Sequence, residues 1–178
     1  MEEMFDILNE NATSLNYTDT RDNAHTKGLW HKAVVVFIVN SRGEVLLQKR
    51  SGNKKMWPNM WDVSCGGHCD AGEFGFETAI REVKEELGLT IKKEQLLYIG
   101  VSRSSQNINN IKDNMFNEYF VAFLDVNPEN LKLQNEEVTS AKFVTKEELK
   151  NMILGGYKNL TPKVEAFEAL LNYLNKFN

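Results

Sequence analysis

Cysteine, excess positive charge and long apolar stretches are all scarce in this sequence of 178 residues. Its two cysteines, Cys65 and Cys69, have no Cys or His pair elsewhere that would complete a structural zinc site, so we expect reduced thiols. No stretch approaches the roughly 18 apolar residues of a membrane span. The acidic start, MEEMFDILNE, lacks an apolar core, so we expect neither a signal peptide nor an anchor. These absences favour a cytoplasmic protein without a membrane partner.

The overall charge excludes another class of partner. A formal net charge of -4 and a pI of about 5.5 argue against a general nucleic-acid-binding surface, which is normally basic. We therefore expect no nucleic-acid partner. An acidic protein that handles anionic phosphates must concentrate positive charge locally or use a metal ion.

The most informative stretch is GHCDAGEFGFETAIREVKEELGL, residues 67–89. Apolar side chains recur there at helical spacing and predict a helix over residues 74–87 with one buried stripe. Three glutamates at positions i, i+3 and i+4 share a different stripe, where their like charges repel. The apolar stripe consists of Ile80, Val83 and Leu87, and the acidic stripe of Glu82, Glu85 and Glu86.

A carboxylate cluster with few basic partners suits a hard divalent cation. Mg²⁺ typically binds one or two protein carboxylates, keeps several waters and takes further ligands from substrate phosphates. For the glutamates taken alone, a solvated acidic helix face is the alternative.

The spacing of the whole stretch carries more information than the glutamates. Gly67, five residues, Glu73, seven residues and then REVKEELGL match every fixed position of the Nudix box. Seven fixed letters at roughly 7% usage each coincide by chance on the order of once in 10⁸ starting points. The chain therefore resembles the Nudix hydrolases, which cleave nucleoside diphosphates linked to another group, using Mg²⁺ or Mn²⁺. The resemblance implies an α/β (α+β) fold, an α/β/α sandwich with a mixed central sheet, and a small-molecule diphosphate substrate.

The resemblance also implies roles for individual residues. Glu85 and Glu86 rank first as metal ligands, and Glu82 follows as a ligand or as the base that handles water. The backbone carbonyl of Gly67 is a further ligand. Glu73 would order the metal site, and Arg81 would orient a box glutamate. Additional candidates, each of which has a solvated or structural alternative, are Glu118, Glu136, Glu137 and His68.

A basic loop precedes the box. It reaches the segment WPNMW, in which Trp57 and Trp61 suit core or lid packing better than base stacking. If this loop and the acidic helix face one cleft, its cations would attract substrate phosphate; otherwise they are merely solvated. The cations are Lys49, Arg50, Lys54 and Lys55.

Residues 28–33 and 46–61 resemble one subgroup more closely, the Nudix proteins related to type 1 isopentenyl-diphosphate isomerase. These enzymes use a cysteine just before the box glycine, a histidine after it, further metal-binding histidines upstream and a glutamate on a later strand. Here Gly66 stands at the cysteine position, because Cys65 lies one residue earlier, and a one-residue shift in a strand turns a side chain to the opposite face. Phe116 replaces a second acidic residue, and the box is whole.

These departures favour hydrolysis. Isomerisation of isopentenyl diphosphate is the alternative, and a nucleotide-binding module without turnover is a third hypothesis. Of the residues that the isomerases use, His68 matches and Glu118 is a plausible match. His25 and His31 resemble the upstream pair with altered spacing, and we expect them to be structural or exposed.

The remaining pattern predicts one domain, residues 1–178, because no repeat or Pro/Gly-rich linker divides the chain. An N-terminal arm (1–30) would pack on it as a small hairpin, and a final helix (162–177) would start near Thr161 and Pro162. Thr145 and Glu148 predict a capped helix over residues 146–154. Dimers are common among relatives, which leaves a homodimer as one option. Strands are expected at residues 4–8, 33–39, 44–48, 62–64, 96–101, 115–125 and 141–144.

Two long polar segments are predicted to be loops. Residues 102–114 are rich in Asn and Ser and are expected to form a mobile lid or binding loop. Residues 128–137 are expected to form a second variable loop.

Overall fold

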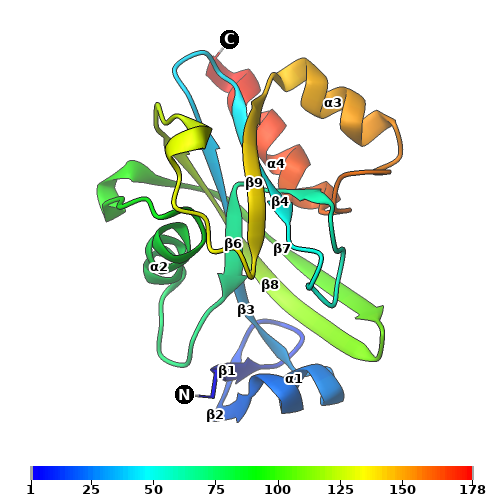
Figure 1. The fold of residues 1–178 in the computed structure, drawn as a ribbon. Coiled ribbons are helices and arrows are strands. Elements are labelled where there is room, and N and C mark those ends of the chain that lie inside the picture. Colours follow the sequence, from blue (N-terminus) through cyan, green and yellow to red (C-terminus); the bar gives the residue numbers. More distant parts are fainter. Residues whose placement is uncertain (1, 178) are drawn as a thin grey trace.

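The computed structural model describes residues 2–177, in which nine strands form one mixed sheet with helices on both of its faces (Figure 1). This is the predicted α/β/α sandwich. The helices are α1 (Arg21–Lys27), α2 (Gly75–Leu87), α3 (Lys146–Leu154) and α4 (Val164–Leu174). The strands are β1 (Met4–Leu8), β2 (Ser14–Thr20), β3 (Trp30–Val39), β4 (Val45–Arg50), β5 (Trp61–Asp62), β6 (Cys65–His68), β7 (Leu96–Ile108), β8 (Ile111–Phe123) and β9 (Val138–Val144).

Strand β3 is the centre of the sheet. It pairs in parallel with β8, from Trp30 opposite Asn114 to Val39 opposite Phe123, and antiparallel with β6. Its apolar run is buried on both faces, as expected for a strand covered by helices on either side. Because β6 and β8 flank β3, the box loop and the later strand meet over its N-terminal half.

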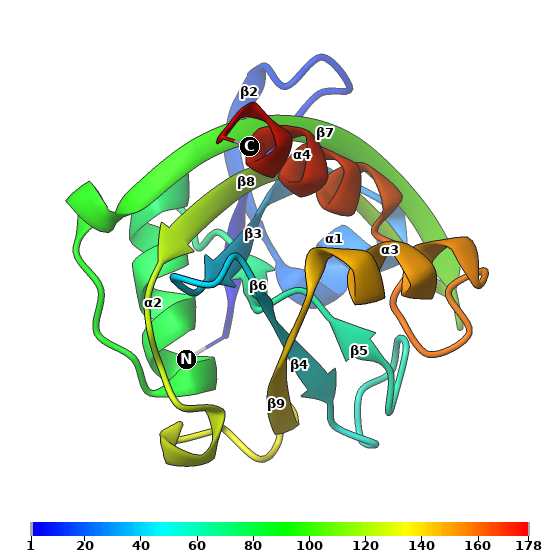
Figure 2. The ribbon, with the colours of Figure 1, turned by 90° about the horizontal axis from the view of Figure 1, so that it is seen from above.

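The two faces of the sheet bury separate cores. Val34, Val36 and Ile38 pack with α2, whereas Val35 and Phe37 pack with α3 and α4. The alternation along β3 follows from the two-residue period of a strand. Figure 2 shows β7 curving around the molecule, with α2 and α3 on opposite sides. This curvature makes one face of the sheet concave.

The prediction of a loop over residues 102–114 is wrong. These residues extend β7 and β8 into a long hairpin, closed by the two-residue turn Asn109-Asn110 between Ile108 and Ile111. Both turn residues have positive φ, 53° and 66°, which matches the twist of a two-residue hairpin and is tolerated by Asn. The hairpin was missed because its side chains are polar, so the apolar alternation that identifies a strand is absent.

The N-terminal arm forms the predicted hairpin from β1 and β2, but it also contains the unpredicted helix α1. The Thr20 hydroxyl accepts the Asn23 N–H at 3.3 Å, and Gly28 ends the helix with φ 72°. These are ordinary helix caps. The arm lies at one end of the sheet, away from the C-terminus (Figure 1).

The other predicted elements differ mainly at their ends. Of the strand predicted at residues 62–64, only Asp62 lies in a strand, at the end of β5, and residues 63–64 connect β5 to β6; β9 begins at Val138. Helix α3 has the expected Thr145 and Glu148 capping box. Helix α4 begins at Val164 rather than at Thr161, because the Thr161 N–H and hydroxyl bond to Trp61 O and Asp62 instead. Among the described residues, no helix is long and apolar enough to cross a membrane.

Candidate functional site

A cavity of about 1230 Å³ is lined by the box, the N-terminal arm and the β7–β8 hairpin. The box contributes Gly67, Glu82, Glu85 and Glu86 to its lining, and the arm closes one end with residues that include His25. The polar side chains of the β7–β8 hairpin form part of the floor. The cavity therefore brings together three segments that are far apart in the sequence.

Glu82 approaches the cavity across the glycine pair of β6. Gly66 and Gly67 occupy the middle of β6, and a Cβ atom added at Gly67 would overlap the Glu82 carboxylate. Glycine at this position is therefore required for the close approach of Glu82 to the β6 backbone.

Arg81 connects the box loop to the acidic stripe. Its Nη2 donates to Glu73 Oε2 at 2.9 Å and to the His68 carbonyl at 3.0 Å, while Nη1 donates to Glu82 at 2.6 Å and to Glu85 at 3.3 Å. Thr78 also donates to Glu73, and these bonds outweigh burial and lower the Glu73 pKa. The geometry supports a positioning role for Arg81 and for Glu73.

Glu86 is buried and Glu82 is partly buried, and both carry raised pKa values. Burial raises the pKa of Glu82 to about 7, although the Arg81 guanidinium opposes the shift. Burial and the neighbouring Glu82 raise the pKa of Glu86 to about 7. The Glu85 side chain is 52% exposed at the cavity mouth. Closely spaced carboxylates with raised pKa values are typical of a cation-binding site.

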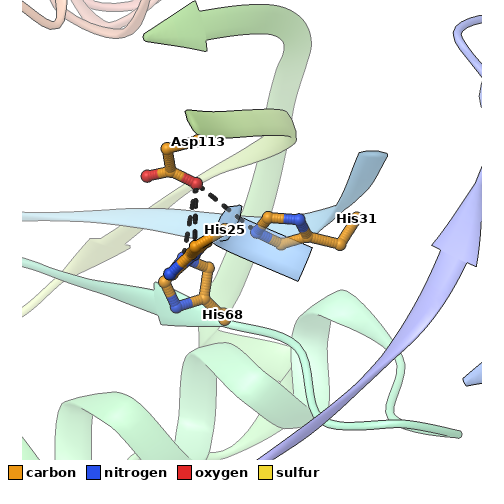
Figure 3. A group of neighbouring side chains, drawn as sticks. All are labelled: His25, His31, His68 and Asp113. Carbon is orange, nitrogen blue, oxygen red and sulfur yellow. Dashed lines mark ion pairs between the residues drawn. The ribbon is translucent and has the colours of Figure 1, made fainter. Parts of the chain in front are cut away.

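A second group of titratable side chains lies at the arm end of the cavity. His25 of α1, His31 of β3, His68 of β6 and Asp113 of β8 point toward one another (Figure 3). Their ligand atoms lie within 4.8 Å of one another. Asp113 Oδ1 is 3.5 Å from Nε2 of His25 and of His31, and 3.8 Å from Nε2 of His68. We call these four residues the His–Asp centre.

Inside the His–Asp centre, the inward atoms lack hydrogen bonds. His25 Nε2, His31 Nε2 and Asp113 Oδ1 are buried without a hydrogen-bond partner, which normally costs free energy. The outward His31 Nδ1 instead lies 2.9 Å from the Leu29 carbonyl. A hydrogen bond from Nδ1 to this carbonyl keeps the proton on Nδ1 and leaves the Nε2 lone pair available, as is usual for metal-binding histidines.

The distances suit a tetrahedral metal. Ligands at about 2.0–2.2 Å from a zinc-like ion in tetrahedral geometry stand roughly 3.4 Å apart, close to the 3.5 Å separations observed here. Burial lowers the pKa of His68 to about 4, so its imidazole is neutral, the form that binds metals. The neighbouring histidines outweigh burial and hold the Asp113 pKa below its usual range, so its carboxylate is ionised. The four residues therefore fit a borderline transition-metal ion such as Zn²⁺ or Mn²⁺.

The structure separates the other candidate residues into two groups. Arg50, Lys54, Lys55, Glu136 and Glu137 line the cavity, and Lys54 pairs with Glu137. Lys49 and Glu118 are absent from the described lining.

Glu118 occupies a different place. Its carboxylate lies against Gly75, the first residue of α2, where a Cβ atom would overlap it. Helix N-termini favour negative charge, which gives Glu118 a structural role at this position.

Part of this arrangement has no signal in the sequence. Asp113 fell in the segment expected to be a loop, and His25 and His31 were expected to be structural or exposed. The pairing of β3 with β8 brings His31 beside Met115, two residues from Asp113. The histidines, separated by 43 residues in sequence (25 to 68), gave no local spacing signal.

The NUDIX domain family model matches residues 29–164, which include the box and most of the sheet. The chain belongs to the Nudix family. It is 38% identical over 154 residues to the uncharacterized Nudix hydrolase lin0387 of Listeria innocua, with 86% of each chain covered.

The chain is also similar to an isomerase in sequence and to a solved structure in fold. An isopentenyl-diphosphate Delta-isomerase of Saccharopolyspora erythraea is 28% identical over 156 residues, covering 88% of this chain and 79% of the isomerase. The crystal structure of DR0079 from Deinococcus radiodurans has a TM-score of 0.71 and 23% identity, and 98% of each chain is covered, which shows the shared fold. Family and fold identify this Nudix protein as a pyrophosphohydrolase.

Proposed function

We propose that this Nudix enzyme hydrolyses a diphosphate bond in a nucleoside diphosphate linked to another group. Its Mg²⁺ or Mn²⁺ would be held by Glu85 and Glu86, by Glu82 as ligand or base, and by the Gly67 carbonyl. The observation that carries the proposal is that the partly buried Glu82 and the buried Glu86 line one cavity, each with a pKa of about 7. When bound, the cation neutralises phosphate charge and acidifies water.

The protein's own residues prepare this wall. Gly67 allows the Glu82 carboxylate to approach the β6 backbone, and Arg81 holds Glu82 through a bond of 2.6 Å. Arg50, Lys54 and Lys55 line the cavity and add positive charge to an otherwise acidic protein. Arg50 and Lys54 are already paired with Asp62 and Glu137, so we assign attraction of the substrate phosphates to Lys55.

The cavity floor supports a polar substrate. Ser102, Ser104 and Gln106 of β7 and Asn117 of β8 line the cavity, and Asn117 Nδ2 donates to the Ser104 hydroxyl at 2.8 Å. Hydroxyl and amide groups can bind the sugar or base of a nucleotide, whereas a hydrocarbon chain could form no hydrogen bonds with them. The floor therefore favours a nucleoside diphosphate derivative over isopentenyl diphosphate.

Isomerisation is the second candidate, and the His–Asp centre is the observation that favours it. Against it, the Cys65 side chain packs in the α2 core, and burial raises the pKa of its thiol well above the usual value. Gly66 has no side chain to replace it at the cavity. Cys65→Ala should therefore leave the reaction unchanged, whereas loss of activity with proton exchange at an allylic carbon would favour isomerisation.

We propose a transition-metal ion for the His–Asp centre, separate from the Mg²⁺ of the box. The support is chemical: three imidazoles and one carboxylate prefer a borderline ion, while the all-oxygen box prefers Mg²⁺. The two centres would thus differ in the ions that they retain.

Hydrolysis can be tested with a panel of nucleoside diphosphates, diphosphate sugars, dinucleotides and isopentenyl diphosphate. Released phosphate would be measured with Mg²⁺ and with Mn²⁺. Glu86→Gln should abolish cleavage without unfolding the protein. Glu77→Gln is the matched control, because Glu77 lies on the same helix and its carboxylate binds the Phe74 N–H instead. An unchanged rate in Glu86→Gln would refute the proposal.

A further inference from the structure

Gln48 is a buried polar residue in the core of the sheet. It follows Val45, Leu46 and Leu47 in β4, all three fully buried, and is itself only 3% exposed. A buried amide requires hydrogen bonds. Its Nε2 donates to Glu86 Oε2 at 3.1 Å, which links the central sheet to the acidic stripe of α2.

The same carboxylate oxygen has a second donor. The Gly66 N–H lies 3.3 Å from Glu86 Oε2, so two N–H groups from β4 and β6 converge on this oxygen. Both donors belong to the sheet, not to the helix that carries Glu86. Together they turn Oε2 toward the sheet, and Oε1 is the oxygen that neither of them engages.

The backbone around Gln48 is held firmly. Its own strand pairs with β5 and β9, where Gln48 lies opposite Asp62 and Ala141. Nearby, the Ser64 hydroxyl donates to the Leu46 carbonyl at 2.5 Å and accepts the Ile38 N–H at 2.8 Å. These bonds connect β3, β4 and the chain entering β6, so the two donors to Glu86 share one rigid support.

Gln48 is retained at a cost to the core. Its Oε1 is buried without a hydrogen-bond partner. An unsatisfied buried acceptor destabilises the folded state, and leucine or methionine would fill a similar volume without this cost. Because the Oε1 atom of Gln48 gains nothing from this position, the Nε2 donor to Glu86 is the part of the amide that accounts for a glutamine here.

We infer that Gln48 is a positioning residue that orients Glu86 for the box cation. The inference rests on the proposed function, because it assigns to Glu86 the ligand role given above. Gln48 acts through Glu86 and does not itself line the cavity. Groups that orient metal ligands typically contribute 10- to 100-fold to metal affinity or activity.

The test compares variants of β4. Gln48→Met keeps the volume and removes the donor, and Gln48→Glu keeps the shape but replaces the donor with a charge. Leu46→Met is the matched control, because Leu46 lies on the same face of the same strand and is fully buried. The Mg²⁺ concentration for half-maximal hydrolysis, kcat and KM would be measured, with Mg²⁺ binding by calorimetry in the absence of substrate.

Gln48→Met should raise the half-activating Mg²⁺ concentration by about 10- to 100-fold and weaken calorimetric Mg²⁺ binding by a similar factor. At saturating Mg²⁺ its KM should remain within about twofold of the parent value, because it does not touch substrate. Gln48→Glu should lose at least as much Mg²⁺ affinity, and Leu46→Met should lose none. If Gln48→Met does not fold, Gln48→Asn can replace it in the comparison, because its shorter side chain places the amide donor one methylene farther from Glu86.

The inference is overturned if Gln48→Met retains the parent Mg²⁺ dependence, or if Leu46→Met shifts it equally. A purely structural role would lower the melting temperature without changing Mg²⁺ affinity, and that result also overturns it. Its failure is separable from failure of the proposed function. With Glu86→Gln inactive and Gln48→Met unchanged, only this inference fails; with Glu86→Gln active, the proposed function itself fails.

Discussion

Arg81 Nη2 lies 3.0 Å from the backbone oxygen of His68. The same guanidinium binds Glu73, Glu82 and Glu85, so one side chain touches both the acidic stripe and a member of the His–Asp centre. Phe5 of the arm stacks on His31, with ring centroids 4.5 Å apart, on the other side of that centre. The His–Asp centre therefore lies between the box and the N-terminal arm.

This position leads to a prediction about metal removal. Because His25 belongs to the arm and the other three members to the main sheet, an ion there would join the arm to the sheet. A chelator should lower the melting temperature and expose the β1–β2 turn to proteases, and Zn²⁺ or Mn²⁺, but not Mg²⁺, should reverse both effects. An ion present at about 100 times its dissociation constant contributes about 2.7 kcal/mol.

Differential scanning fluorimetry and limited proteolysis would measure these effects. Asp113→Asn should reproduce the chelated state, and Asp19→Asn, in an ion pair of the arm with Lys27, is the control. A melting temperature unaffected by chelation, with no metal in the purified protein, would contradict the prediction.

Glu118 is a carboxylate to which we assign a structural role, in contrast to the glutamates of the box. Its carboxylate lies at the N-terminus of α2 and outside the described cavity lining. Glu118→Gln should preserve hydrolysis and lower stability by about 0.3–1 kcal/mol, the usual contribution of a charge at a helix N-terminus. Rate assays beside Glu86→Gln and urea unfolding would measure both quantities. A large loss of rate would instead make Glu118 a metal ligand.

Asp62 predicts how stability depends on pH. It is 1% exposed and lies 3.0 Å from Arg50 and 3.1 Å from Lys163, and the Thr161 hydroxyl donates to it at 2.6 Å. Burial opposes ionisation, but the two cations and the hydrogen bonds outweigh it and lower the Asp62 pKa. The stabilisation is therefore complete above the unfolded-state pKa, near 4, and is lost as the pH falls through the lower folded-state value.

Asp62→Asn should cost about 1–3 kcal/mol at neutral pH, because the partly buried Arg50 and Lys163 lose their carboxylate partner. The difference from the parent protein should shrink as the pH falls below about 4. Urea unfolding between pH 3 and pH 7 would measure it, with Glu44→Gln at the exposed Arg42 pair as the control. A difference that stays constant over that range would contradict the assignment.

The sequence predicted α2, the central strand and the helix caps because their signals are local. The box fixes its glutamates and Gly67 within 23 residues (67–89), and β3 is marked by its unbroken apolar run. The His–Asp centre could not be predicted in this way. Its members come from four elements, and Asp113 is placed only by the pairing of β8 with β3 and with the polar strand β7.

The arm gives the chain a functional boundary that differs from its family boundary. The family match begins at residue 29, four positions after His25. A shortened protein starting at Leu29 would keep the entire box and every strand that carries it. It would lose His25, however, and the remaining three members of the His–Asp centre would be open to water on that side. If the protein binds ions at both sites as proposed, such a truncation would leave only the proposed magnesium site, and the loss would be visible in its metal content before any assay.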